Sequence, residues 1–294
     1  MTQLDNFELD KQLLVKVLAR PQRPAAQSIL DTIAVRLFER LDLLKEAPTR
    51  IFDLGTGDGR HLSLLQSRFP DALVIGADLS LQRLCKSRAS RRFWQKRQRL
   101  ICLDATTQLP VASDSFDLVV SNMMLPWIFR SESLAAEINR VLLPDGAFFL
   151  SSAGPDTLIE LRRAWAQIDD NLHVNAFMDM HDVGDMFGAA GIGDPVLDTE
   201  RLTVSYPSLD ALLSELIGLG FLNTLAGRRK GLTAGSVRQR LEEHYPLNDT
   251  GGVDATLELV VAHGWSGVPG SAQTSGTRDG GGEFYFPADQ LRRK

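Results

Sequence analysis

The chain has 294 residues, of which 44% are hydrophobic and 23% charged, and both shares are ordinary for a folded globular protein. Its formal net charge is -5, so the molecule as a whole is not built to coat nucleic acid. The two cysteines, Cys85 and Cys102, do not form a C-x-x-C pair, which argues against a disulfide scaffold or a zinc site. The chain lacks a long apolar run and a basic N-terminal signal, and we therefore expect a cytoplasmic protein without a membrane partner.

Helical and strand-like segments alternate through the first half of the chain. Apolar residues recur at three- and four-residue steps from Ala25 to Ala47, which predicts an amphipathic helix. Strands are then expected at residues 50–55, 72–80, 99–105, 115–123 and 146–154, with helices at 58–69, 81–95 and 132–142. Because each strand is a nearly continuous apolar run, the pattern indicates a parallel sheet covered on both faces, a doubly wound α/β fold.

The pattern changes after Pro155. Residues 157–168 and 180–191 are helical, residues 200–207 and 255–265 are strand-like, and a helical stretch at 208–245 separates these two strands. We expect an antiparallel pair to finish the sheet, with a late helical insertion over it. The predicted organisation is one domain over residues 1–265, with a ligand-binding core at about 48–152 and a substrate-side tail at about 153–265. Residues 266–294 are expected to form a flexible segment, rich in glycine and serine up to residue 282.

A glycine-dense turn, D-L-G-T-G-D-G, follows the first strand. Gly55, Gly57 and Gly59 allow left-handed backbone angles and let a ligand touch the main chain, although glycines also mark simple tight turns. The spacing G-x-G-x-G departs from the dinucleotide pattern G-x-G-x-x-G, because Arg60 stands where that pattern needs a third small residue. Asp58 inside the turn would repel a phosphate, so the turn fits a neutral or cationic ligand better.

Polar residues at the strand ends complete the expected site. Asp53 precedes the turn, and Asp78 at the end of the second strand can accept hydrogen bonds from both hydroxyls of a ribose. Asp104 follows the third strand, where it can meet an adenine amino group, and Ser121 and Asn122 end the fourth. A single aspartate at a strand end is often a helix cap. Polar groups at four successive strand ends beside a glycine turn indicate a nucleoside site instead.

These motifs resemble those of the S-adenosylmethionine-dependent class I methyltransferases, whose seven-stranded sheet is Rossmann-like. DLGTGDG resembles their first motif, ADLS their ribose-binding strand end, LDA their adenine contact and FDLVVSN their fourth-strand motif. The resemblance implies S-adenosyl-L-methionine as the cofactor and helices on both faces of the sheet. The cofactor-binding residues that it implies are Asp53, Gly55, Thr56, Gly57, Gly59, Asp78, Leu79, Asp104, Ala105 and Asn122.

The tail narrows the resemblance. Residues 154–191, with their T-L-x-E-L-R-x-A-W run, and the segment SNMMLPW resemble the malonyl-acyl carrier protein O-methyltransferases of biotin synthesis. This implies methyl transfer to the free carboxylate of a malonyl thioester on acyl carrier protein, an early step in making the pimeloyl chain. Such a carboxylate, with an ordinary pKa near ~4, needs no general base, and no catalytic residue is assigned. Candidates for positioning the acceptor are Asn122, Trp127, Arg162 and Arg163, with Arg228 and Arg229 further along the chain.

Two alternatives stay open. The tail pattern occurs more loosely in the mitochondrial complex I assembly factor that hydroxylates an arginine, and a non-catalytic cofactor-binding scaffold would show the same core motifs. The chain also departs from its family. Relatives carry aromatic residues in the N-terminal segment that closes over the cofactor, whereas the three tyrosines here are Tyr206, Tyr245 and Tyr285.

A basic segment, residues 83–99, carries eight arginines and lysines and no acidic residue. It is interpreted as a docking surface for acyl carrier protein, through Arg88, Arg91, Arg92 and Lys96. A solvated helix face is the simpler interpretation, and RNA contact through Phe93 and Trp94 is a third.

The remaining singled-out residues have structural interpretations. His61, in the first turn of its helix, is expected at the surface or as a neighbour of the helix cap, and Trp165 in the core. His173 and His181 have no partner ligands at metal spacing, so we expect no metal.

Overall fold

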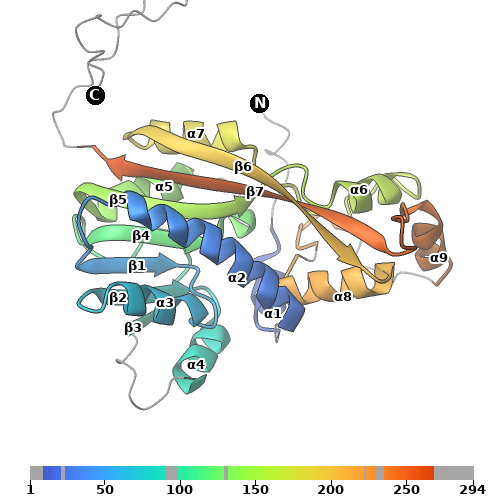
Figure 1. The fold of residues 1–294 in the computed structure, drawn as a ribbon, viewed down its shortest axis with the longest axis horizontal. Coiled ribbons are helices and arrows are strands. Elements are labelled where there is room, and N and C mark those ends of the chain that lie inside the picture. Colours follow the sequence, from blue (N-terminus) through green and yellow to red (C-terminus); the bar gives the residue numbers. More distant parts are fainter. Residues whose placement is uncertain are drawn as a thin grey trace, which may run out of the picture.

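The computed structural model describes residues 9–20, 24–90, 99–128, 132–221, 223–228 and 235–267. Its centre is a seven-stranded sheet in the order β3-β2-β1-β4-β5-β7-β6, with helices packed against it (Figure 1). The strands are β1 (Arg50–Leu54), β2 (Leu73–Asp78), β3 (Arg99–Cys102), β4 (Phe116–Asn122), β5 (Leu142–Ala153), β6 (Ile192–Tyr206) and β7 (Val253–Ser266). The predicted α/β, Rossmann-like fold is confirmed.

The first five strands pair in parallel. On β1, Ile51 packs into the core on one face of the sheet and Phe52 into the core on the other, and neither side chain is exposed. Burial on both faces explains why this strand is apolar at successive positions rather than alternating. The carboxyl ends of these strands meet at one edge of the sheet, where ligands of doubly wound folds bind.

Helices cover both faces. On one face α2 (Pro24–Glu39), α3 (Arg60–Arg68) and α8 (Leu209–Leu219) contribute to a single core, and on the other face α5 (Glu132–Val141) and α7 (Met180–Ala189) form a second. The predicted helix at 25–47 is shorter, because α2 ends at Glu39 and a 3-10 turn, Arg40–Leu43, follows. The other helices are α1 (Lys11–Leu18), α4 (Leu81–Ser90), α6 (Ile159–Ala166) and α9 (Gly235–His244).

The late strands finish the sheet. β7 runs antiparallel to both β5 and β6, as predicted, and α8 and α9 lie between β6 and β7 in the chain. β6 begins earlier than expected, directly after Gly191, whose φ of 86° lets the chain turn out of α7. Because the second half of β7, from Leu259 to Trp265, pairs with β5, the tail and the core share one sheet.

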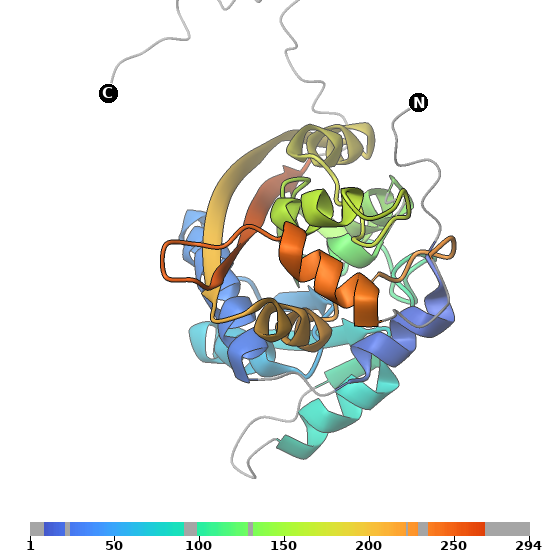
Figure 2. The ribbon, with the colours of Figure 1, turned by 90° about the vertical axis from the view of Figure 1, so that its right-hand side faces the viewer.

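Helix α1, which the sequence patterns did not predict, lies beside α4 at one end of the molecule (Figure 2). Among the described residues no helix is both long and apolar enough to cross a membrane. Residues 91–98 of the basic segment and the expected flexible segment beyond residue 267 lie outside the described ranges.

Candidate active site

A cavity of about 980 Å³ opens at the carboxyl ends of β1, β2 and β4. Seven of the ten predicted cofactor-binding residues line it: Gly55, Thr56, Asp78, Leu79, Asp104, Ala105 and Asn122. The other three do not line it: Asp53 lies on β1, and Gly57 and Gly59 lie in the turn that follows this strand. The parallel strand order therefore brings residues of the separate sequence motifs together around one cavity.

The glycine turn is held by bonds within the protein. The backbone N–H groups of Gly55 and Thr56 donate to the carbonyl of Ala77 on β2, at 2.8 and 2.9 Å. The N–H of Gly57 donates to Oδ2 of Asp78 at 2.9 Å. These bonds tie the exit of β1 to the end of β2, so the turn and the ribose-binding candidate form one unit.

Two of the glycines are required by close approaches. A Cβ on Gly55 would lie 2.6 Å from Cβ of Met124, and one on Gly59 would lie 1.8 Å from Oγ of Ser87. Both backbones also have positive φ, 78° and 75°. A side chain at either position would overlap a neighbouring residue and would also strain the left-handed backbone.

Asp53 stabilises the glycine turn through a hydrogen bond to Thr56. Its side chain is buried and accepts a hydrogen bond from the hydroxyl of Thr56 at 2.6 Å. Burial raises the pKa of Asp53 to about 7, against an ordinary value of 3.8. A structural role fits this residue, because it does not face the cavity.

Asp78, at the end of β2, is a buried carboxylate that lines the cavity. Besides the Gly57 bond, its Oδ1 accepts the N–H of Ser80 at 2.7 Å, and Arg83 lies nearby. Burial raises the pKa of Asp78, while those two backbone donors and Arg83 act against that rise. The side chain is thereby fixed at the strand end with lone pairs left for further donors, which fits a ribose.

Asp104 is bound by residues that the motifs did not indicate. Nζ of Lys11 on α1 lies 2.9 Å from its Oδ2, and both the N–H and the hydroxyl of Thr106 donate to its Oδ1. Partial burial would raise the pKa of Asp104, but the hydrogen bonds from Thr106 and Lys11 outweigh it, and the pKa is lowered. Asp104 is thus held ionised at the cavity edge.

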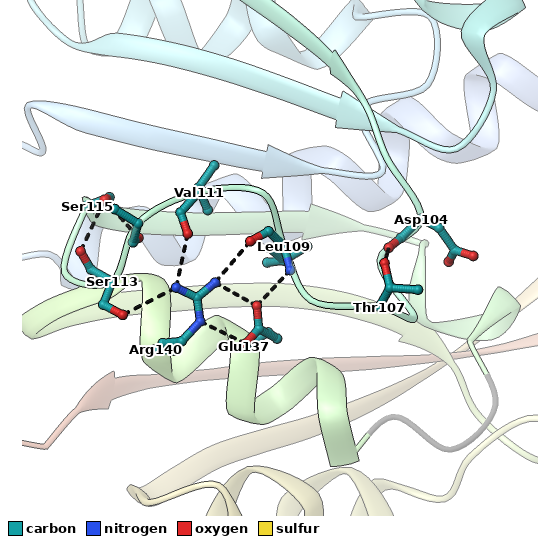
Figure 3. Close-up of polar contacts among 9 residues, drawn as sticks. Asp104, Thr107, Leu109, Val111, Ser113, Ser115, Glu137 and Arg140 are labelled. Atoms are coloured by element: carbon teal, nitrogen blue, oxygen red, sulfur yellow. Dashed lines mark hydrogen bonds and ion pairs between the residues drawn. The ribbon is translucent and has the colours of Figure 1, made fainter.

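The loop that carries Asp104 is anchored to α5 (Figure 3). Arg140 donates to the carbonyls of Leu109 and Val111 at 3.1 and 3.0 Å, and it is paired with Glu137 at 2.7 Å. Glu137 in turn accepts the N–H of Leu109 at 2.7 Å. One ion pair on α5 therefore satisfies several backbone groups of the loop.

Helix α1 closes one side of the cavity. Leu14 and Leu18 pack with Trp127, and Nε of Arg83 donates to the carbonyl of Leu18 at 2.5 Å. The start of the helix is tied to the segment after α8, because the N–H of Asp10 donates to the carbonyl of Thr224 at 2.8 Å. Leucines of this short N-terminal helix therefore line the cavity.

Of the two expectations for His61, an exposed surface position is wrong, whereas its place beside the cap is confirmed, since it lies two residues after the N-cap Gly59 of α3. Its side chain is 13% exposed, lines the cavity and contacts Phe38 edge-on, with ring centroids 5.8 Å apart. Burial lowers the pKa of His61, although Asp31 and Asp58 act to raise it. The position on α3 was read correctly, but α2 covers that face of the helix.

Among the acceptor candidates, Trp127 and Asn122 line the cavity, whereas Arg162 and Arg163 do not. Trp127 is buried and packs on Phe221, with ring centroids 5.4 Å apart. Arg162 is half-buried and donates to the carbonyls of Pro155 and Thr157, at 2.8 and 3.2 Å, so its guanidinium organises its own loop.

Basic residues other than Arg162 and Arg163 lie at the cavity. Lys11, Arg60 and Arg83 line the cavity. Arg228, another candidate, pairs with Asp10 at 3.0 Å instead, and Arg229 lies outside the described residues. No group of three or more His, Cys, Asp or Glu side chains in the described part of the chain is arranged to hold a metal ion.

Comparisons with known proteins agree with this geometry. Residues 52–150 match a family described as a methyltransferase domain. The malonyl-[acyl-carrier protein] O-methyltransferase of Laribacter hongkongensis is 41% identical over 238 residues, which are 78% of this chain and 80% of that protein. The enzyme of the same name from Gallionella capsiferriformans is 36% identical over 90% of this chain and 94% of its own.

Solved structures are more distant. The YcgJ protein of Bacillus subtilis superposes with a TM-score of 0.57 at 18% identity, over 79% of this chain and 98% of that one. Phosphoethanolamine N-methyltransferase 2 of Haemonchus contortus, solved with S-adenosyl-L-methionine, gives 0.51 at 15% identity, over 79% and 52%. At these identities the likeness shows the fold alone.

Proposed function

The chain belongs to the malonyl-[acyl-carrier protein] O-methyltransferase family, and from this premise we propose that its cavity binds S-adenosyl-L-methionine and serves methyl transfer to the free carboxylate of a malonyl thioester on acyl carrier protein. The observation that carries the proposal is the cavity itself, where the glycine turn and Asp78 stand on one wall and Trp127 on another. The reaction would serve an early step of biotin synthesis.

The residues present fit an adenosyl sulfonium. Asp78 would accept hydrogen bonds from the ribose, and Leu79 and Ala105 would flank the base, with Asp104 at its edge. The carboxylates of Asp78 and Asp58 on the wall favour a cationic ligand over a phosphate. When bound, the cofactor supplies a methyl group on a positively charged sulfur.

The acceptor side of the cavity is apolar. Trp127, Phe221 and Leu219 line it together with Leu14 and Leu18 of α1, which would exclude water from the reacting groups. The acceptor carboxylate is ionised at neutral pH and attacks without a general base, so the task of these residues is alignment.

The cations on the wall are already partly neutralised. Lys11 lies 2.9 Å from Asp104, and Arg60 lies 3.0 Å from Asp31. Arg162 and Arg163 do not line the cavity, so the proposal assigns neither of them a contact with the acceptor carboxylate.

A labelled-methyl assay tests the proposal. Transfer is expected to malonyl-acyl carrier protein, and none to the same thioester whose carboxyl is already a methyl ester. Asp78→Ala should abolish binding of S-adenosyl-L-homocysteine in calorimetry, while Asp71→Ala, at an exposed turn, should leave binding intact. Cofactor binding without methyl transfer would contradict the proposal and favour the scaffold or hydroxylase alternatives.

We also propose that acyl carrier protein docks on the basic segment. Arg83 and Lys86 of that segment contact the carbonyls of Leu18 and Ala19 at the end of α1, so the described start of the segment adjoins the side of the cavity that α1 lines. An acidic partner would be drawn there by charge. The candidate docking residues remain a prediction, because Arg91, Arg92 and Lys96 lie outside the described residues and nothing is described of the Arg88 side chain.

Reversing the charge of the basic segment distinguishes docking of the carrier protein from methyl transfer itself. Changing Arg88, Arg91 and Arg92 together to glutamate should slow turnover of malonyl-acyl carrier protein at low salt, while a small malonyl thioester without the carrier is methylated as before. Unchanged turnover of the carrier-bound acceptor at low salt would place docking elsewhere.

A further inference from the structure

The side-chain amide of Asn122, at the end of β4, is oriented from two sides. Its Nδ2 lies 3.3 Å from the carbonyl oxygen of Leu30 on α2 and 3.4 Å from Nδ1 of His61 on α3. Its Oδ1 accepts the hydroxyl hydrogen of Ser151 at 2.7 Å. The hydroxyl oxygen of Ser151 also accepts the N–H of Met123 at 3.0 Å, so its one hydrogen is directed to Asn122.

This network fixes which way round the amide lies. A flipped amide would set its oxygen against the carbonyl oxygen of Leu30, where neither atom can donate, and would turn toward the Ser151 hydroxyl an NH2 group that cannot accept its hydrogen. With both Nδ2 hydrogens directed at Leu30 and His61, the hydrogen-bonding capacity left to Asn122 is a lone pair on Oδ1. Asn122 therefore faces a ligand as an acceptor.

The same bonds assign the protonation of His61. Its Nδ1 receives a hydrogen from Asn122, so Nδ1 is unprotonated and the ring hydrogen is on Nε2. Nε2 faces Oδ1 of Asp31 at 3.5 Å, a long contact, and Asp31 is itself paired with Arg60 at 3.0 Å. Burial, which lowers the pKa of His61, favours this neutral form.

We propose that His61 is a positioning residue, which in its neutral Nε2–H form, with Asp31 behind it, keeps the oxygen of Asn122 available to the ligand. A protonated His61 would carry a hydrogen on Nδ1 directed at the amide hydrogens of Asn122, and the contact would become repulsive. The inference rests on the proposed function, and it assigns Asn122 to hydrogen-bond donors of the cofactor. An amide oxygen does not bind the acceptor carboxylate, because both groups are hydrogen-bond acceptors.

Two substitutions at His61 distinguish its hydrogen bond to Asn122 from the space that its ring fills. His61→Asn places an oxygen near the position of Nδ1, so the bond from Asn122 can re-form. His61→Phe keeps a ring against Phe38 but offers no acceptor. We expect the dissociation constant of S-adenosyl-L-homocysteine to rise about three- to tenfold in His61→Phe, the loss of one hydrogen bond, with most of it restored in His61→Asn.

A double-mutant cycle tests whether His61 acts through Asn122. In an Asn122→Ala background, His61→Phe should weaken binding no further, because the group that His61 orients is gone. Losses that simply multiply would show that His61 acts independently and would overturn the proposal. Denaturation curves of each variant confirm that it folds.

Nitrogen NMR of the cofactor-free enzyme gives a readout without ligand or turnover. The chain has five histidines, and the His61 signals are those that disappear in His61→Asn. At pH 7.5 we expect a neutral ring with the hydrogen on Nε2, whereas a hydrogen on Nδ1 or a charged ring refutes the assignment. If the proposed cofactor did not bind, calorimetry would fail for the unsubstituted enzyme while the NMR result would still decide the tautomer.

Discussion

Replacing Gly55 by alanine tests the packing of the turn against the exit of β4. The new Cβ would lie 2.6 Å from Cβ and 2.9 Å from Cγ of Met124, and the backbone has a φ of +78°. Gly251 provides a matched control, because its φ is +80° but nothing lies within 4 Å of an added Cβ. The pair separates backbone strain from steric overlap.

The size of each effect follows from this geometry. A left-handed backbone angle destabilises an alanine by about 1–2 kcal/mol, which is the expected effect of Gly251→Ala on the free energy of unfolding. At Gly55 the overlap adds about 1–3 kcal/mol, because Cβ of Met124 is fixed to the backbone and cannot swing away. The expected loss for Gly55→Ala is therefore about 2–5 kcal/mol.

Urea denaturation monitored by circular dichroism measures both losses, and calorimetric titration with S-adenosyl-L-homocysteine measures binding. We expect Gly55→Ala to lose binding, since any shift of the turn displaces the cavity wall, and Gly251→Ala to bind as the unsubstituted enzyme does. Equal destabilisation of the two variants, or normal binding by Gly55→Ala, would refute the reasoning.

Two further predictions concern buried or bridging charges. Burial raises the pKa of Asp53 from 3.8 to about 7, so the folded chain holds a proton that the unfolded chain releases. The free energy of unfolding should therefore decrease as pH rises through this interval, and Asp53→Asn should remove that contribution; an unchanged pH dependence of the urea midpoint would contradict it. Arg140→Met should destabilise the protein by about 2–4 kcal/mol, because it removes the ion-pair partner of Glu137 and the donor to the carbonyls of Leu109 and Val111. Arg163→Met, at an exposed position, should change stability by less than ~0.5 kcal/mol, and similar losses for the two would contradict the anchoring role.

The parts of the site that sequence predicted are those fixed by local pattern. Continuous apolar runs identified the parallel strands, and their carboxyl ends then had to bring Asp78, Asp104 and Asn122 to one edge. The glycine turn was recognisable because positive φ restricts the residue type at its positions.

The parts that sequence missed depend on contacts between distant segments. Helix α1 is short, and its place is set by bonds to Asp104, to Arg83 and to Thr224. His61 looked exposed because nothing near it in sequence covers it, whereas Asp31 and Phe38 of α2 do so in space. In the same way, no local pattern shows that the guanidinium of Arg162 is used by carbonyls of its own loop.

The bonds inside the glycine turn have a consequence for turnover. Because Gly55, Thr56 and Gly57 donate to Ala77 and Asp78, the turn has its shape before any ligand arrives. A turn that is ordered in advance would lose little conformational entropy when the proposed cofactor binds, and it would also bind the demethylated product, which differs from that cofactor by one methyl group. Release of the demethylated product from a cavity that α1 lines on one side would then limit the rate of turnover.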